Sequence, residues 1–218
     1  MNRVVFNVLT KLIQDRFLKH TGLELPKEVS QKDMALLTLK KKDGAVIVII
    51  GTRDTGKTEL AYRLAEFLGK PTYAVSPEQH PRPHFIQRIK FNEIDEIVKP
   101  GSTLILDDAP AYISSRDYHE ELVRQLERII PMVRHERKLH LIVVTQSGAF
   151  IDKWALDAEA VFLKPLSLLS EDIERPGVRR LYQYANLHFE GKDLDWVKRH
   201  CFLATPTWRG ILEVKMVK

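Results

Sequence analysis

The most constraining feature of the sequence is an apolar run that breaks abruptly into a glycine-rich loop, at residues 45–58 (AVIVIIGTRDTGKT). The apolar residues 46–50 predict a buried strand, and the apolar spacing from Glu59 onward predicts a helix. A strand, a G-x-x-x-x-G-K-[ST] loop and a helix, in this order, form the phosphate-binding loop. A chance match is the alternative, and the flanking elements argue against it. The stretch therefore predicts binding of a nucleoside triphosphate.

Each position of this loop has a chemical reason in that interpretation. Two glycines let the backbone curl so that successive N–H groups point at phosphate oxygens. The lysine would contact the β- and γ-phosphates, and the threonine hydroxyl is a candidate Mg²⁺ ligand. The helix that follows directs its positive end at the same anion. We therefore predict that ATP is bound by Gly51, Thr52, Arg53, Asp54, Thr55, Gly56, Lys57, Thr58 and Glu59, with Thr58 on the metal.

A second apolar segment, residues 103–106, ends in two carboxylates in the stretch TLILDDAP. We expect Asp107 to hold Mg²⁺, through water, opposite Thr58. Asp108 is then placed to orient and deprotonate the attacking water. An exposed Asp-Asp turn after a strand is the plain alternative. The pair indicates a hydrolase, because it follows the phosphate loop in the order that nucleotide-hydrolysing domains require.

A third apolar segment, residues 139–145, ends at Gln146. In a doubly wound sheet the carboxyl ends of the strands line the ligand crevice. We expect the Gln146 amide to bond the γ-phosphate or the attacking water; the alternative is a polar residue that caps a turn. Arg134 and Arg137 precede the segment and are solvated surface charges in the simplest interpretation. In a ring of identical subunits either could reach the neighbour's γ-phosphate as a catalytic arginine, and we favour Arg134.

Composition places the chain among ordinary globular proteins, with 218 residues, 44% hydrophobic and 29% charged. A single cysteine, Cys201, excludes an internal disulfide framework and argues against a structural zinc site. The N-terminus lacks a signal-peptide cleavage site and no apolar run is long enough to span a bilayer, so we expect a cytoplasmic protein. The net charge of +5 is compatible with nucleic-acid contact without requiring it.

Strands alternating with helical patterns predict an α/β fold with a parallel sheet covered on both faces. We expect one P-loop ATPase domain, with an N-terminal helical extension (1–44), an ATPase core (45–165) and a C-terminal α/β extension (166–218). Other predicted elements are an amphipathic helix ending near Gly22, a strand or short helix at 34–42, a helix ending at Gly69, strands at 72–75 and 160–163, an irregular loop at 76–85, a long helix at 118–135, short strands at 187–189, 202–204 and 211–216, and a helix at 194–200.

With these three motifs in order, the chain resembles the HerA–FtsK superfamily of P-loop ATPases. The residues that carry the resemblance are GTRDTGKT, LILDDAP and the pattern R-x-x-x-x-L-H-L-I-V-V-T-Q from Arg134 to Gln146. Within the superfamily, the short chain looks most like the genome-packaging ATPases of tailless icosahedral viruses with internal membranes. The resemblance covers roughly residues 45–165. One departure is Asp108, where many members carry Glu, and this puts its role as the base in doubt.

The resemblance implies a three-layer, RecA/FtsK-like sandwich that uses ATP and Mg²⁺. It implies a homo-oligomeric ring, hexameric or pentameric, that moves double-stranded DNA and packages a viral genome into a preformed capsid. The partners would be the DNA, further copies of the chain, and capsid or portal-vertex proteins, in the host cytoplasm or on the virion. Arg116 and Lys153, in the loops after the second and third motifs, are candidate DNA contacts; the alternative for each is a plain surface charge.

Two other functions are compatible with the phosphate loop. A non-viral, HerA-like DNA translocase would carry the same motifs. A small nucleotide kinase or an assembly ATPase acting on proteins is a different class, and residues 80–88 (HPRPHFIQR) could supply part of a kinase lid. Gln146 has no role in the kinase interpretation.

Overall fold

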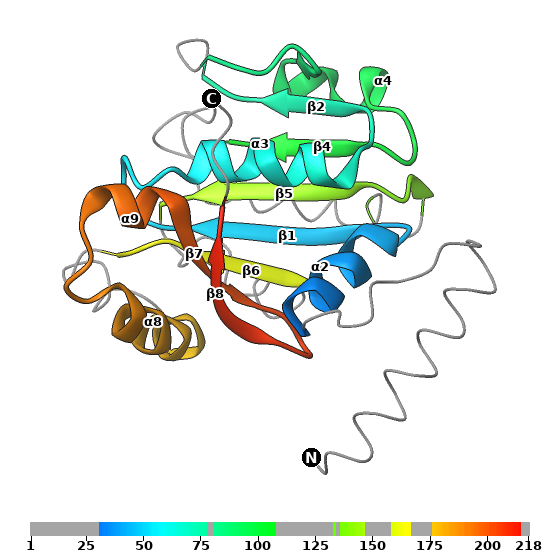
Figure 1. The fold of residues 1–218 in the computed structure, drawn as a ribbon. Coiled ribbons are helices and arrows are strands. Elements are labelled where there is room, and N and C mark those ends of the chain that lie inside the picture. The colour runs from blue at the N-terminus through cyan, green and yellow to red at the C-terminus, as the bar shows by residue number, and fades with distance from the viewer. Residues whose placement is uncertain are drawn as a thin grey trace, which may run out of the picture.

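The computed structural model describes residues 31–77, 81–107, 133, 136–146, 158–166 and 176–214. Eight strands form one sheet with the order β3-β2-β4-β5-β1-β6-β7-β8 (Figure 1). The strands are β1 (Ala45–Ile50), β2 (Thr72–Val75), β3 (Ile86–Arg88), β4 (Thr103–Leu106), β5 (His140–Thr145), β6 (Ala160–Leu163), β7 (His200–Ala204) and β8 (Arg209–Glu213). The helices are α2 (Gln31–Lys41), α3 (Lys57–Leu68), the 3₁₀ turn η1 (Phe91–Glu93), α4 (Ile94–Ile97), α8 (Pro176–Phe189) and α9 (Leu194–Arg199).

The centre of the sheet is parallel and is organised around β1. This strand pairs in parallel with β5 on one side and β6 on the other, so that Ile47 stands opposite both Ile142 and Ala160. All six β1 residues are buried, as expected of a strand with neighbours on both sides and helices on both faces. Only β7 and β8, at one edge, run antiparallel to their neighbours. The carboxyl ends of β1, β4, β5 and β6 therefore meet along one rim of the sheet.

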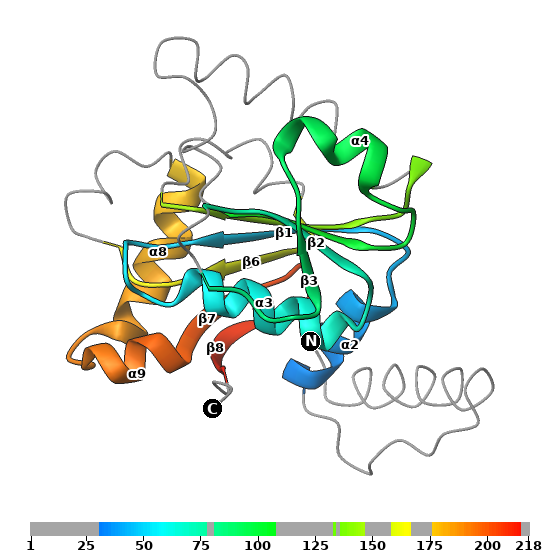
Figure 2. The same cartoon turned by 90° about the horizontal axis from the view of Figure 1, so that it is seen from above.

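Alternation along β1 divides the core into two layers, one on each face of the sheet. Val46, Val48 and Ile50 contribute to the cluster that also contains buried residues of α4 and α8. Ala45, Ile47 and Ile49 contribute to the cluster that contains buried residues of α2 and α3. Figure 2 shows α4 on one side of the sheet and α2 and α3 on the other. The predicted α/β fold, a mostly parallel sheet between helical layers, is confirmed.

The strands at 72–75, 103–106 and 160–163 are found at the predicted bounds, and the strand predicted at 139–145 begins one residue later. In the segment predicted as a strand or short helix at 34–42, residues 34–41 are helical, as part of α2. The strand predicted at 187–189 is wrong, because those residues end helix α8, whose buried positions follow a helical spacing: Val178, Tyr182, Ala185 and Phe189. Strand β3 was not predicted: it is short and follows a proline-rich loop.

Several predicted elements lie wholly or mostly outside the described residues, including the helix ending near Gly22 and the helix at 118–135. Residues 176–214 form helices α8 and α9 and strands β7 and β8, and the two strands extend the same sheet. The proposed boundaries at 44 and 165 stay predictions. Within the described ranges, no helix has the length and apolar character needed to cross a membrane.

Candidate nucleotide site

The phosphate loop joins β1 to α3, and hydrogen bonds from both neighbouring strand ends hold it. Gly51 N–H donates to the Thr145 carbonyl at the end of β5 (3.3 Å), and Thr52 N–H donates to the Pro165 carbonyl just beyond β6 (3.0 Å). Inside the loop, the buried Thr55 hydroxyl donates to the Thr52 carbonyl at 2.8 Å. These bonds fix the loop at the rim where the parallel strands end.

Gly56 precedes helix α3 with a φ of 83°, a left-handed conformation that favours glycine. This conformation turns the chain from the loop directly into the first turn of the helix, whose free N–H groups carry partial positive charge. The next residue, Lys57, folds its side chain back over the loop, and its Nζ donates to the Thr52 carbonyl at 2.6 Å. The lysine ammonium and the helix N-terminus thus lie together, an arrangement suited to binding phosphate.

The two predicted metal ligands are in direct contact. Thr58 Oγ1 donates to Asp107 Oδ2 at 2.9 Å, although the residues are 49 positions apart. Asp107 follows β4 and is only 2% exposed. A hydroxyl and a buried carboxylate side by side are oxygen ligands of the kind that Mg²⁺ prefers. Among the described residues, no group of three or more Asp, Glu, His or Cys side chains is arranged to hold a metal ion. Mg²⁺ at nucleotide sites needs only one or two protein ligands besides water and phosphates. The pair therefore fits Mg²⁺.

Gln146, at the end of β5, also reaches the phosphate loop. Its Oε1 accepts a hydrogen bond from Arg53 Nε at 3.2 Å. Strand β5 lies between β1 and β4 in the sheet, so Gln146 lies between the loop and Asp107. Gln146 lines the same cavity as Lys57 and Asp107. Its role at the γ-phosphate or the attacking water stays a prediction.

These residues line one cavity of about 640 Å³ at the rim of the sheet. Tyr62, from the second turn of α3, forms part of its wall; burial, and secondly the negative charge of Asp107, raises the pKa of this phenol. Most of the lining residues belong to the predicted site, but Lys198 of helix α9 does not. The lining residues are Arg53, Asp54, Gly56, Lys57, Thr58, Glu59, Tyr62, Pro81, Asp107, Val144, Thr145, Gln146 and Lys198.

Arg137 does not belong to this cavity. It lies before β5, at the opposite end of the strand from Gln146, and its guanidinium donates to the backbone carbonyls of Ile94, Val98 and Asp95 at 3.4, 3.2 and 2.9 Å. Within its own chain it holds the α4 segment against β5. A role at a neighbour's nucleotide stays a prediction. Four other predicted residues, Asp108, Arg116, Arg134 and Lys153, lie outside the described residues.

Two lysines at the site were not predicted from the sequence. Lys164 follows β6 and is fully buried; its Nζ donates to the carbonyls of Val197, Lys198 and His200 at 2.9, 2.8 and 2.7 Å. Burial lowers the pKa of the Lys164 ammonium to about 8. The signal for Lys164 was a polar residue directly after an apolar strand, the same signal that identified Gln146. Nothing local identified Lys198.

No protein-family model matches the chain, and no curated protein matches its sequence. Among solved structures, B204, the DNA-packaging ATPase of Sulfolobus turreted icosahedral virus, superposes with a TM-score of 0.53 at 12% identity, over 80% of this chain and 98% of that one. The cytoplasmic domain of the type VII secretion ATPase EccC from Thermomonospora curvata gives a TM-score of 0.54 at 10% identity, over 81% of this chain and 26% of that one. At these identities the likeness concerns the fold, which is that of the P-loop ATPases.

Proposed function

We propose that the chain is an ATPase that moves double-stranded DNA, of the genome-packaging type within the HerA–FtsK superfamily. The observation that carries the proposal is the position of Gln146 in the same cavity as Lys57 and Asp107. A phosphate loop alone is shared by kinases, GTPases and motors. A glutamine at a strand end next to the nucleotide would contact the γ-phosphate, and loss of this phosphate on hydrolysis could then change the position of the strand end.

Binding of the triphosphate would use the loop N–H groups, the N-terminus of α3 and the Lys57 ammonium. The contact at 2.6 Å between Lys57 Nζ and the Thr52 carbonyl keeps this charge over the loop. When phosphate binds, the Lys57 ammonium would replace its neutral carbonyl partner with charged phosphate oxygens. Hydrogen bonds between two charged groups are stronger than those to a neutral acceptor.

Hydrolysis would take place on the side of Asp107. Thr58 and Asp107 would hold Mg²⁺, which when bound neutralises charge that develops on the phosphoryl oxygens. Gln146 would orient the attacking water with its amide. Asp108 would accept the proton of that water as the general base. The buried Asp107 carboxylate accepts a hydrogen bond from the Thr58 hydroxyl, and this contact between the two proposed ligands supports a shared metal.

Coupling to DNA would begin at Gln146, whose contact with Arg53 joins the end of β5 to the phosphate loop. In the proposed ring, Arg134, or else Arg137, of one subunit would complete the site of the next, and Arg116 and Lys153 would contact the DNA backbone. Capsid or portal-vertex proteins would be the further partners. A non-viral translocase would use the same site residues in the same way.

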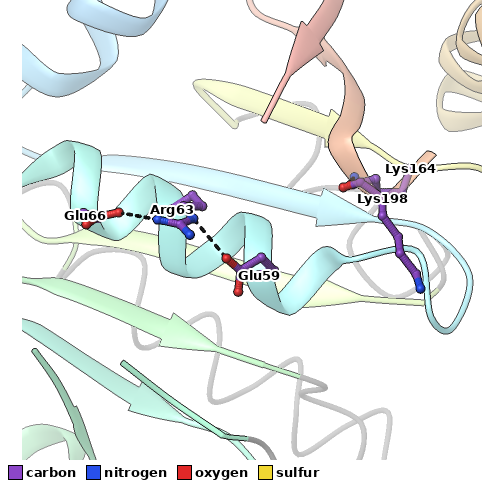
Figure 3. Close-up of polar contacts among 5 residues, drawn as sticks. All are labelled: Glu59, Arg63, Glu66, Lys164 and Lys198. Carbon is purple, nitrogen blue, oxygen red and sulfur yellow. Dashed lines mark hydrogen bonds and ion pairs between the residues drawn. The ribbon is translucent and has the colours of Figure 1, made fainter. Parts of the chain in front are cut away.

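A nucleotide kinase is the competing function, and a cavity of about 350 Å³ next to the phosphate loop is the observation that favours it. Its lining includes Arg63, His84 and Phe85. Arg63, however, is engaged by Glu59 at 3.0 Å and by Glu66 at 2.9 Å (Figure 3). Since both acids pair with the only described cation that lines this cavity, the cavity is a weak acceptor for a second phosphate group.

The ATPase rate, measured with and without double-stranded DNA, separates the two functions. We expect stimulation by DNA with a steep dependence on salt, because contacts to the DNA backbone release counterions. Lys57→Ala should remove nucleotide binding and serve as the inactive control. A rate that ignores DNA and rises instead with a nucleoside monophosphate would overturn the motor in favour of the kinase.

A further inference from the structure

Helix α9 packs directly against the phosphate loop. A Cβ atom placed on Gly56 would lie 3.3 Å from the carbonyl oxygen and 3.7 Å from the Cα of Lys198. The absence of a side chain at Gly56 thus allows the end of α9 to approach the loop backbone. This brings a residue from the C-terminal part of the chain, 141 positions after Lys57 in the sequence, to the edge of the nucleotide cavity.

The Lys198 side chain lines that cavity together with Gly56, Lys57 and Thr58. Lys198 is half-buried. Among the residues that the structure describes, no hydrogen bond or ion pair engages its ammonium, in contrast to Lys57, which bonds the Thr52 carbonyl. A positive charge with spare donors at the wall of a phosphate cavity is suited to an anionic ligand.

Lys164 fixes the position from which Lys198 reaches the cavity. Its ammonium donates to three carbonyls at the end of α9, one of them that of Lys198 at 2.8 Å. Figure 3 shows the two lysines together beside the loop that joins β1 to α3. Because all three protons of the Lys164 ammonium are used, Lys164 is not itself available to a ligand. It is a positioning residue that holds α9 against the phosphate loop.

The strand order decides which part of the nucleotide Lys198 would meet. Asp107 follows β4 and Lys164 follows β6, and these strands lie on opposite sides of β1. In the proposed site the metal and the terminal phosphates would lie on the Asp107 side, where Thr58 and Gln146 also lie. Lys198 approaches from the β6 side, across the loop from the metal pair, and would therefore lie nearest the phosphate next to the nucleoside.

We propose that Lys198 is a second phosphate-binding cation of this site, supplied by the same chain, and that it contacts the α-phosphate of a nucleoside di- or triphosphate. The inference rests on the proposed binding of nucleotide. It makes the residues after 166 part of the nucleotide site, through α9 and the contact between Lys164 and Lys198.

The test compares Lys198→Gln, Lys198→Arg and a control, Arg199→Gln, which removes the same charge from the next residue of α9. Arg199 is exposed and does not line the cavity. We would measure the Kd of ADP and of ATP with Mg²⁺ by calorimetry, after checking that the melting temperatures of the variants agree. We expect Lys198→Gln to weaken both ligands by the same factor, roughly tenfold, since one charge-assisted hydrogen bond is lost. Lys198→Arg should stay within about threefold of the wild type, and Arg199→Gln should bind like the wild type.

Equal affinities of Lys198→Gln and Arg199→Gln would overturn the inference, and so would a loss confined to ATP, which would place Lys198 at the γ-phosphate. If the wild type binds and Lys57→Ala does not, while Lys198→Gln binds normally, the inference alone fails. A wild type that binds neither ADP nor ATP would remove the proposed function together with the inference.

Discussion

Gln146 Oε1 accepts a hydrogen bond from Arg53 Nε at 3.2 Å, which links the end of β5 to the phosphate loop across 93 positions of the sequence. The two side chains lie at the wall of the same cavity as Lys57. This contact gives the proposed γ-phosphate sensor a partner within the loop. Loss of a phosphate next to Gln146 would therefore change the contacts of both the end of β5 and the phosphate loop.

Replacement of Gln146 should separate binding from hydrolysis. In Gln146→Ala we expect ATP affinity within about threefold of the wild type and a kcat lower by roughly a hundredfold, because the loop and Lys57 are intact and the water loses its orienting group. The measurements are nucleotide calorimetry and a phosphate-release assay. Gln183→Ala, at an exposed position of α8, is the matched control. Unchanged hydrolysis in Gln146→Ala would contradict the role.

Asp107→Asn should remove the contribution of Mg²⁺ to ATP affinity. The asparagine keeps the size of the side chain and can still accept a hydrogen bond from Thr58, but it lacks the charge that favours a divalent cation. We expect the ratio of ATP affinity with Mg²⁺ to that with a chelator to fall by about tenfold or more, measured by titration with a fluorescent nucleotide. Asp43→Asn, whose side chain is exposed and pairs with Lys138 on the surface, is the control and should keep the ratio. A ratio like that of the wild type in Asp107→Asn would exclude Asp107 from the metal site.

Gly51→Ala should destabilise the fold itself. A Cβ on Gly51 would lie 2.5 Å from the Cβ and 3.2 Å from the Cα of Lys164, so strands β1 and β6 would have to separate at their carboxyl ends. We expect a loss of about 2 kcal/mol or more in the free energy of unfolding, measured by urea denaturation. A Cβ on Gly101 would meet no atom within 4 Å, but the residue has a positive φ that an alanine disfavours. Gly101→Ala should therefore lower the free energy of unfolding by only about 1 kcal/mol. Equal losses at both positions would show that the close approach is not limiting.

Lys164 should give the protein a pH-dependent stability in the alkaline range. Burial lowers the pKa of its ammonium from 10.5 to about 8 in the folded chain. Between these values the unfolded chain binds the proton and the folded chain does not, so the free energy of unfolding rises with pH across this window. Relative to Lys164→Met, the free energy of unfolding of the wild type should rise by up to roughly 3 kcal/mol from pH 8 to 10.5.

Urea denaturation of both proteins at several pH values checks this, and exposed Lys99→Met is the control that should leave the pH dependence unchanged. A difference between wild type and Lys164→Met that is flat, or that falls, over this window would contradict the titration of Lys164.

The proposed ring makes a prediction about mixtures of inactive variants. Arg134→Ala should bind ATP and fail to hydrolyse it, because the arginine would act on the neighbour's nucleotide. Lys57→Ala should fail to bind but still offer its arginine. Mixed together, the two should recover part of the ATPase rate, and each variant mixed with wild type provides the reference. A mixture that stays inactive would place the catalytic arginine elsewhere.

The sequence by itself determined the elements whose signals are local. The apolar run and the glycine-rich loop at 45–58 predicted β1, the phosphate loop and the start of α3, because strand burial, loop curvature and helix periodicity are all encoded in neighbouring residues. The strand ends at Asp107 and Gln146 followed from the rule that parallel strands present their carboxyl ends to a ligand. The prediction of a strand at 187–189 was wrong, because it considered these three residues apart from the helical spacing of the apolar residues before them.

The tertiary structure alone decided what lies beside the phosphate loop. Strand β5 enters the sheet between β1 and β4, which places Gln146 between the loop and Asp107. Residues after β6 return to the same rim through α9, where Lys164 bonds Lys198 across 34 positions. Contacts of this kind depend on strand order and on the packing of a short helix against Gly56, and no local pattern of side chains encodes either. The loop was therefore evident from its own residues, whereas the lysine that faces it from α9 became visible only when the chain was folded.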